Sequence, residues 1–156
     1  LIGPVPWNDE YGTDSALVGE PNVNVSAPCK VAEKELEWRA YVTQHADGKV
    51  DLARLYGTAE WLAAYAYARV ELPESRDLLL KIGSNDGFKC WFNGEVVGRY
   101  DGGRSYGPDQ DSLRVRAKEG INEIIIKVTQ MGSAWAFSAR LTDLKNEPID
   151  LTESAG

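Results

Sequence analysis

Hydrophobic and polar residues alternate along most of the chain. A period of two places alternate side chains on opposite faces of an extended strand. The clearest run covers residues 62–72, where Leu, Ala and Val alternate with Tyr, Arg and Glu. Similar alternation predicts strands at 36–42, 78–82, 113–117, 124–128 and 135–141. Turn-forming residues rich in Gly, Asn, Asp and Pro separate these runs.

Short strands at close spacing, without a long helical pattern, predict an all-β fold. We therefore expect an antiparallel β-sandwich. Two segments leave an alternative open, because residues 31–42 could begin with a short helix and residues 50–56 could form one helical turn. The first thirty residues, with four prolines, predict an extended wrapping segment and loops.

Asn93-Gly94 predicts a tight hairpin, since both residues tolerate the positive φ angles that a two-residue loop needs. The strand before it then places Phe88, Cys90 and Phe92 on one face. Trp91 falls on the other face. A sandwich buries one face of each sheet, so Trp91 is either covered by a loop or exposed for a purpose.

The chain has 156 residues, 43% of them hydrophobic, which is enough for one core. We expect one domain over residues 1–145 and a polar tail or linker over 146–156. Because the chain begins at Leu1, we expect an excised domain or a processed product. The formal charge of −7, with basic residues scattered singly, makes nucleic acid and anionic membranes unexpected partners.

Few residues suit catalysis. His45, the single histidine, lies beside a predicted surface turn. Asp109 and Asp111, if both lie in a strand, share a face about 7 Å apart, a spacing that overlaps that of inverting glycosidases. Capping a turn is the other reading of this pair. With Asp101 they also offer oxygen ligands, which leaves structural calcium as an alternative.

The two cysteines, Cys29 and Cys90, are far apart and belong to no CxxC pair, so they do not predict a zinc site. A buried free thiol at Cys90 and a disulfide to Cys29 are both compatible with the sequence.

Residues 98–111 contain almost nothing to bury. Tyr100, Arg104 and Tyr106 offer aromatic faces and forked donors, and Asp109 and Asp111 offer acceptors. Sugar rings need this mixture, because they present apolar C–H patches and a rim of hydroxyls. A solvated loop packed by its own tyrosines is the alternative.

Two tryptophans extend this hypothesis. Trp135 follows the glycine-bearing loop at 130–134, where it is either a core residue or a ligand contact. Trp61 precedes its strand and, like Trp7, is little constrained by the pattern. The predicted ligand-binding residues are Tyr100, Arg104, Tyr106, Asp109, Asp111, Trp61 and Trp135.

Several motifs carry a family resemblance. GSNDGFKCWFNGEVV, GPDQD, KEGINEIIIKV, GSAWAFSARLTD and the opening LIGPVPWNDEYG together span nearly the whole chain. The sequence resembles the galactose-binding-domain-like β-sandwich, a non-catalytic module of bacterial carbohydrate-active and other secreted multidomain proteins. It is also distantly similar to the sugar-binding sandwich domain of family 2 glycosidases, whose Trp-x-Asn-Gly hairpin matches Trp91, Asn93 and Gly94 and serves architecture there.

The resemblance implies a jelly-roll sandwich of about eight strands with a ligand site on loops at one end. It also implies a secreted, periplasmic or cell-surface location and a covalently attached neighbouring domain. The sequence departs from the family pattern at Cys90, where an aliphatic residue is expected, and in the added Trp61.

We therefore expect a carbohydrate-binding module, without catalysis, that targets an attached enzyme to a polysaccharide or oligosaccharide. The alternative is a structural or protein-interaction domain that packs against a neighbouring catalytic domain. That alternative predicts an exposed apolar patch around Trp7 or Trp61.

Overall fold

The computed structural model describes residues 1–31, 33–132, 134–149 and 152–153. Its elements are β1 (Ile2–Pro6), β2 (Cys29–Val31), β3 (Lys34–Leu36), β4 (Val50–Asp51), α1 (Leu52–Tyr56), β5 (Leu62–Leu72), β6 (Arg76–Asn85), β7 (Phe88–Phe92), β8 (Glu95–Tyr100), β9 (Asp111–Ala117), β10 (Gly120–Gln130), β11 (Ala136–Thr142) and β12 (Thr152–Glu153). Among the described residues, no helix has the length and apolar character to cross a membrane.

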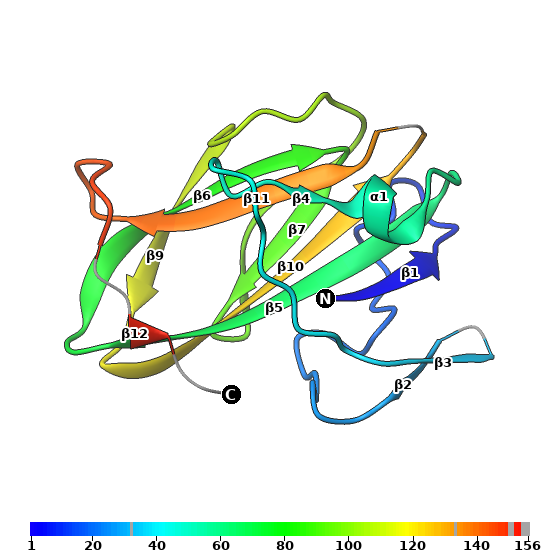
Figure 1. Cartoon of the computed structure of the whole chain (residues 1–156). Helices are drawn as coiled ribbons and strands as arrows, with labels where there is room; N and C mark the ends of the chain where they lie inside the picture. Colours follow the sequence, from blue (N-terminus) through cyan, green and yellow to red (C-terminus); the bar gives the residue numbers. More distant parts are fainter. Residues whose placement is uncertain (32, 133, 150–151, 154–156) are drawn as a thin grey trace.

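The strands form two main antiparallel sheets that lie against each other (Figure 1). The larger sheet has the order β1-β5-β10-β7-β8, and β12 also pairs with β5. The smaller sheet has the order β4-β11-β6-β9, and β2 and β3 form a separate hairpin. The prediction of an antiparallel β-sandwich is confirmed.

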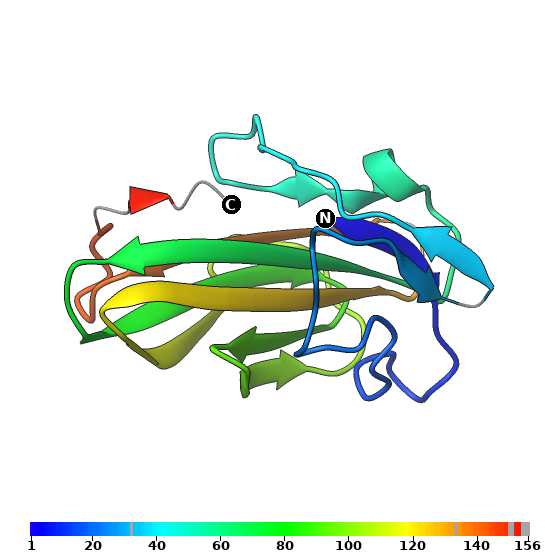
Figure 2. The ribbon, with the colours of Figure 1, turned by 90° about the horizontal axis from the view of Figure 1, so that it is seen from below.

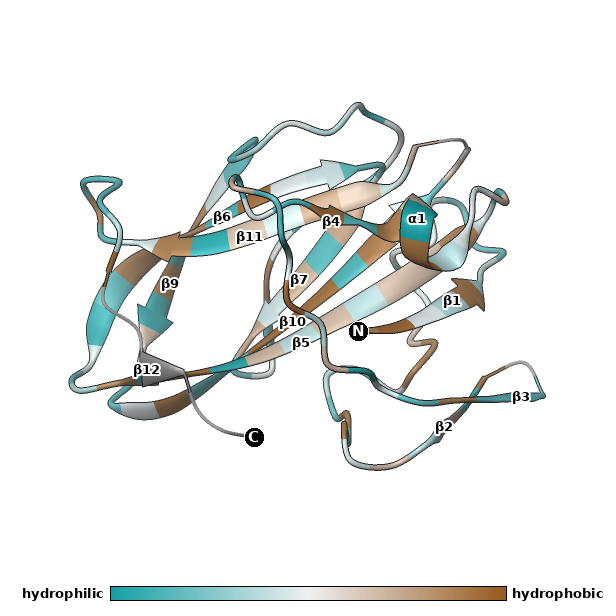
Figure 3. Ribbon diagram, in the orientation of Figure 1, coloured by the Kyte–Doolittle hydropathy of each residue, from teal (hydrophilic) through white to brown (hydrophobic). Residues whose placement is uncertain are grey.

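Strand register explains how the alternating pattern builds the core. In the larger sheet, β10 pairs with β5 from Gly120 opposite Leu72 to Gln130 opposite Leu62. On its other side, Ile126 lies opposite Cys90 of β7. Directly opposed residues share a face, so apolar residues of neighbouring strands gather on the same side. Figure 3 shows the resulting alternation of hydrophobic and hydrophilic residues along the strands.

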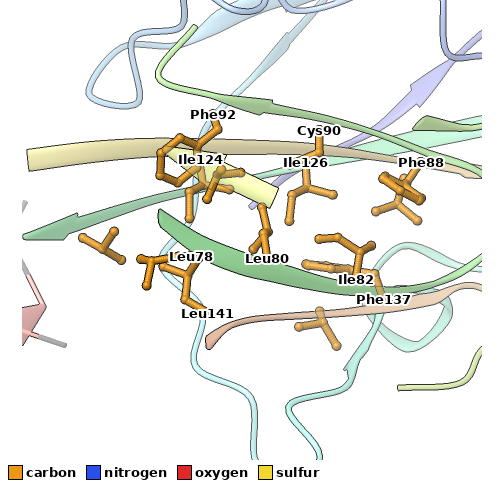
Figure 4. Close-up of a cluster of buried hydrophobic side chains, with 14 of the residues drawn as sticks. Leu78, Leu80, Ile82, Phe88, Cys90, Phe92, Ile124, Ile126, Phe137 and Leu141 are labelled. Carbon is orange, nitrogen blue, oxygen red and sulfur yellow. The ribbon is translucent and has the colours of Figure 1, made fainter. Parts of the chain in front are cut away.

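The main core lies between the two sheets. In Figure 4, side chains of β7 and β10 meet those of β6 and β11. The labelled residues of this cluster are Leu78, Leu80, Ile82, Phe88, Cys90, Phe92, Ile124, Ile126, Phe137 and Leu141. Burying one such Leu, Ile or Phe side chain contributes about 1.5–3 kcal/mol, so burial of this layer strongly favours folding.

A second apolar cluster covers the outer face of the larger sheet. The segment between β1 and β2 crosses that face (Figure 2), and its Leu17 and Val18 pack near Trp91 and Ile125. Trp91 is therefore only 5% exposed. The predicted wrapping role of the first thirty residues is confirmed, and Trp91 is covered rather than exposed.

The strand predicted at 36–42 is wrong. Only Leu36 belongs to a strand, β3, and residues 37–48 are irregular. The short helix considered for the start of 31–42 is also wrong, since the described residues there, 31 and 33–36, contain no helix and belong mostly to β2 and β3. Leu36 and Trp38 pack against the second cluster, whereas Val42 is 85% exposed. The apolar residues of this segment alternate because some of them contact the outer face of the larger sheet, not because the segment forms a paired strand. The helical turn considered at 50–56 is present as α1, which Asp51 caps by accepting from the Arg54 amide.

The hairpin prediction is confirmed, because Asn93 and Gly94 have φ angles of 49° and 84° between β7 and β8. The region predicted as a polar tail has contacts with the domain. Pro148 forms a bridge with Thr142, and β12 pairs with residues 70–71 of β5. Residues 150–151 and 154–156 of that region lie outside the described residues.

Candidate functional site

A cavity of about 600 Å³ lies at one end of the sandwich. It is open to solvent and is lined by residues of β4 and α1, the end of β6, the loop after β8 and the loop before β11. The lining residues are Lys49, Asp51, Ala53, Thr58, Asn85, Ser105, Tyr106, Ala134, Trp135 and Ala136. The site thus joins the two loops that the sequence predicted as ligand-binding, although they are distant in the chain.

A buried carboxylate connects these two loops. Asp86 lies in the turn between β6 and β7. Its Oδ1 accepts from the backbone N–H of Arg104 at 3.2 Å, and its Oδ2 accepts from the backbone N–H of Met131 at 2.7 Å. Hydrogen bonds to a charged acceptor are stronger than neutral ones. Asp86 therefore fixes both loops relative to the sheet edge.

The loop at 101–110 also lies directly on β6. The Ser84 amide donates to Gln110 Oε1 at 2.8 Å, and Gln110 Nε2 donates to the Ser105 carbonyl at 2.7 Å. A Cβ at Gly83 would lie 2.0 Å from the Gly107 carbonyl oxygen. Glycine at position 83 is thus required for this approach, and the loop is positioned without apolar burial.

Arg104 stabilises the same loop from within. Its guanidinium donates to the Ser84 carbonyl and hydroxyl at 3.2 and 2.9 Å, and to Asp111 Oδ2 at 2.6 Å. It also lies 4.3 Å from the centre of the Tyr100 ring, within the range of a cation–π contact. Tyr100, Arg104 and Asp111, all predicted ligand contacts, lie outside the cavity lining and hold the loop in place.

Tyr106 is the predicted loop residue that reaches the cavity. Its hydroxyl donates to Asp47 Oδ2 at 3.1 Å, and Lys49 Nζ lies 5.2 Å from its ring centre. Burial raises the pKa of Tyr106 above its ordinary value, so the hydroxyl keeps its proton at neutral pH. An oriented aromatic ring beside an ammonium group therefore forms one wall.

Trp135 and Asn85 also belong to the lining. Trp135 is 1% exposed, and the centre of its ring lies 6.0 Å from the centre of the Tyr56 ring. Its Nε1 donor and the Oδ1 acceptor of Asn85 are buried and have no hydrogen-bond partner among the described residues. An unpartnered buried polar atom costs about 1–3 kcal/mol. Asn85 and Trp135 line the cavity, but these two atoms are covered by protein atoms and have almost no surface open to it.

The two remaining predicted residues, Asp109 and Trp61, are not among the residues that line the cavity. Asp109 pairs with Arg140 through contacts of 2.6 to 3.2 Å, and this pairing holds the pKa of Asp109 below its ordinary value. Asp109 has a φ of 55° and lies before β9, which begins at Asp111. The condition that both carboxylates lie in one strand is not met, because Asp109 is a turn residue that precedes the paired residues of β9. Trp61 is 49% exposed in the loop between α1 and β5.

The three carboxylates considered for calcium are each paired with a different arginine. Asp101 contacts Arg99 and accepts from Thr13, Asp109 contacts Arg140, and Asp111 contacts Arg104. Within the described ranges, no group of three His, Cys, Asp or Glu side chains is arranged to hold a metal ion. The aspartates thus serve as separate ion-pair partners.

The cysteines do not pair. Cys29 and Cys90 are both free, and Cys90 is fully buried in the core. Burial raises the pKa of the Cys90 thiol to about 12, so the thiolate needed for nucleophilic chemistry is not formed at neutral pH. The buried free thiol, one of the two alternatives at sequence level, is the one found.

Sequence reasoning missed Lys49, Asp51, Thr58, Asn85 and Ser105 as lining residues. Asn85 had a usable signal, since it ends an apolar strand and begins the turn Asn85-Asp86-Gly87. Functional residues often lie in loops that follow the end of a strand, because the strand holds the loop in place. Lys49, Asp51 and Thr58 belong to segments with no strong periodicity, and only the tertiary fold brings them to the cavity.

A polar cluster also lies beneath the N-terminal segment. Lys127 is 0% exposed, and its Nζ donates to the Ser15 carbonyl at 2.7 Å and lies 5.6 Å from the centre of the Tyr65 ring. The Tyr65 hydroxyl donates to Glu20 Oε2 at 2.6 Å. Burial lowers the pKa of Lys127 to about 8. The lysine thus binds the covering segment to the larger sheet.

Comparison with known proteins gives one structural similarity. No protein-family model matches the sequence, and no curated protein matches it. The structure is similar to a solved chain described as "PA14 sugar-binding domain from RTX adhesin", with a TM-score of 0.42 and 16% sequence identity. The similarity covers 61% of this chain and 55% of that chain.

Proposed function

We propose that the protein is a non-catalytic carbohydrate-binding domain that holds a sugar ring in the cavity at the end of the sandwich. The Tyr106 ring in the cavity lining, with the Lys49 ammonium 5.2 Å from the ring centre, carries the proposal. An aromatic ring packs against the apolar C–H side of a sugar, and sugar hydroxyls both donate to and accept from the polar side chains around that ring.

The rest of the lining supports this class of ligand. Tyr106 supplies an aromatic wall, and Lys49, Asp51, Thr58 and Ser105 add donors and acceptors around it. Small-molecule sites combine apolar walls with a few polar groups in this way. The volume of about 600 Å³ lies within the range of such sites.

In this proposal the domain acts at the cell exterior, where it keeps a covalently attached enzyme on a polysaccharide. The alternative role, docking against a neighbouring domain, predicts an apolar patch around Trp7 or Trp61. Trp7 is only 6% exposed, which leaves the Trp61 indole as the exposed part of that pair. We therefore favour carbohydrate binding over a docking role.

The test is a glycan array probed with the wild type and with two cavity variants, Asn85→Ala and Tyr106→Ala. Tyr41→Ala is the matched control, because Tyr41 is an exposed tyrosine outside the cavity lining. We expect the wild type and the control to bind the same glycans and both cavity variants to lose them. Binding that persists unchanged in both cavity variants would place the site elsewhere.

A further inference from the structure

Trp61 is a bulky apolar side chain at the cavity-bearing end that the fold leaves half exposed. Its loop, between α1 and β5, is part of the cavity rim, since Thr58 lines the cavity. Three residues span at most about 11 Å, so the Trp61 backbone lies within that distance of Thr58. The loop contacts the start of the loop that leads into β11, because a Cβ at Gly132 would lie 3.8 Å from Glu60 Cγ, and Figure 1 shows both loops at this end of the sandwich.

The backbone fixes the position of Trp61. Its N–H donates to the Gln130 carbonyl at 3.0 Å, and its carbonyl accepts from the Trp7 N–H at 3.1 Å. Its φ of 61° lies in the left-handed region, which bulky residues rarely adopt. The residue is therefore held in one conformation between β1 and β10.

Trp7 fixes the orientation of the indole ring. The two rings meet edge to face, with centres 5.2 Å apart and planes at 87°. Trp7 itself is buried, and its Nε1 donates to the Leu62 carbonyl at 2.9 Å. A Cβ at Gly12 would lie 2.6 Å from the Trp7 ring, so the N-terminal segment packs directly on it. Trp61 thus presents a preoriented aromatic surface with little conformational freedom to lose on binding.

We propose that Trp61 is a second sugar subsite and that the ligand is an oligosaccharide or polysaccharide chain, with one ring in the cavity and a neighbouring ring against the indole. The inference rests on the proposed function. An aromatic face packs well against the C–H side of a sugar ring. A single exposed indole fits one ring of a chain better than a protein interface, which requires a broad apolar surface.

The test compares short and long ligands. Titration calorimetry uses glucose, galactose, mannose and xylose, each beside its homologous hexasaccharide, with the wild type, Trp61→Ala and Trp61→Phe. We expect Trp61→Ala to weaken hexasaccharide binding about tenfold, which corresponds to about 1.4 kcal/mol, and to leave monosaccharide binding within about twofold. Trp61→Phe should retain most of the hexasaccharide affinity, because it keeps an aromatic ring.

Two further variants separate the possible failures. Trp38→Ala removes a partly exposed tryptophan that packs on Tyr67, outside the cavity lining, and should leave both affinities unchanged. Asn85→Ala should abolish both. If Trp61→Ala lowers the affinity for monosaccharide and hexasaccharide equally, or lowers neither, the second subsite is wrong while the cavity site stands. A wild type that self-associates through Trp61, with unchanged sugar binding in Trp61→Ala, also overturns it. If the wild type binds neither ligand length, the proposed function itself is wrong and the subsite is wrong with it.

Discussion

The interior of the sandwich and its cavity-bearing end are stabilised by different interactions. Between the sheets, Leu80, Ile82 and their neighbours are buried among apolar side chains, and the packing is collective. At the cavity end, Asp86 and Arg104 hold the loops through directed contacts to individual atoms. The difference shows how a loop with little to bury becomes ordered, and why its remaining side chains are available to a ligand.

Removing apolar volume from the interior should have the largest effect on stability. Leu80→Ala deletes a side chain that is 1% exposed and leaves a cavity between the sheets. We expect the free energy of unfolding to fall by about 2–5 kcal/mol. Urea denaturation followed by tryptophan fluorescence measures this change. A loss below about 1 kcal/mol would mean that the sheets repack and that the interior is less tightly specified than described.

Asp86→Asn tests the polar end directly. The substitution keeps the shape but replaces one of two carboxylate oxygens, so that an NH₂ group faces a backbone N–H of Arg104 or Met131. We expect a loss of about 1–3 kcal/mol in the free energy of unfolding, together with weaker glycan binding as the loops separate. Glu71→Gln, an exposed carboxylate outside the cavity, is the matched control. If Asp86→Asn is as stable as Glu71→Gln, Asp86 does not link the two loops.

Lys127 adds a pH-dependent test, because it is a charged group buried as deeply as the apolar core. Its pKa of about 8 in the folded state lies below the ordinary value of 10.5, so the unfolded chain binds more protons between these values. Stability should therefore rise with pH from about 8 to 10.5, by on the order of 1–3 kcal/mol. Thermal unfolding of the wild type and Lys127→Met across this range measures the effect.

The comparison between the two proteins isolates the lysine, since the other titrating groups occur in both. We expect the rise in stability to be absent from Lys127→Met. Parallel pH profiles for the two proteins would show that the amine is already solvated beneath the N-terminal segment.

A change to the partly exposed part of the cavity lining should have the smallest effect on stability. Tyr106→Ala removes a partly exposed ring from the rim and disrupts no part of the main core. We expect the free energy of unfolding to change by about 0.5 kcal/mol or less, while glycan binding is lost. Paired denaturation and affinity measurements test this separation. A large loss of stability would assign Tyr106 to packing and weaken the contrast between the two regions.

The strands and the hairpin were predictable because their information is local. Alternation at 62–72 and the pair Asn93-Gly94 specify conformation without reference to the rest of the chain. The strand prediction at 36–42 failed because it also used local information alone. Residues 37–42 alternate in polarity but have no partner strand. Alternation of polar and apolar residues indicates that one side of a segment is buried, but it does not indicate which part of the protein buries it.

The cavity was predictable only in part. The loop containing Tyr106 and the loop before Trp135 were identified from composition, and the structure brings both to one cavity. The sequence could not show that Arg104 holds the loop while Tyr106 lines the cavity. Arg104 has its role because Ser84 and Asp111 lie within hydrogen-bond distance in the folded chain. Asn85 and Lys49 reach the site through tertiary folding, which periodicity does not encode.

The most direct test of the central claim is glycan binding measured in solution for the wild type, Asn85→Ala and Tyr41→Ala. Saturation-transfer NMR against the sugars that the array identifies reports contact at the level of individual sugar protons. The account predicts transfer to the sugar ring with the wild type and with Tyr41→Ala, and none with Asn85→Ala. Equal transfer with all three proteins would contradict the assignment of the cavity as the carbohydrate site.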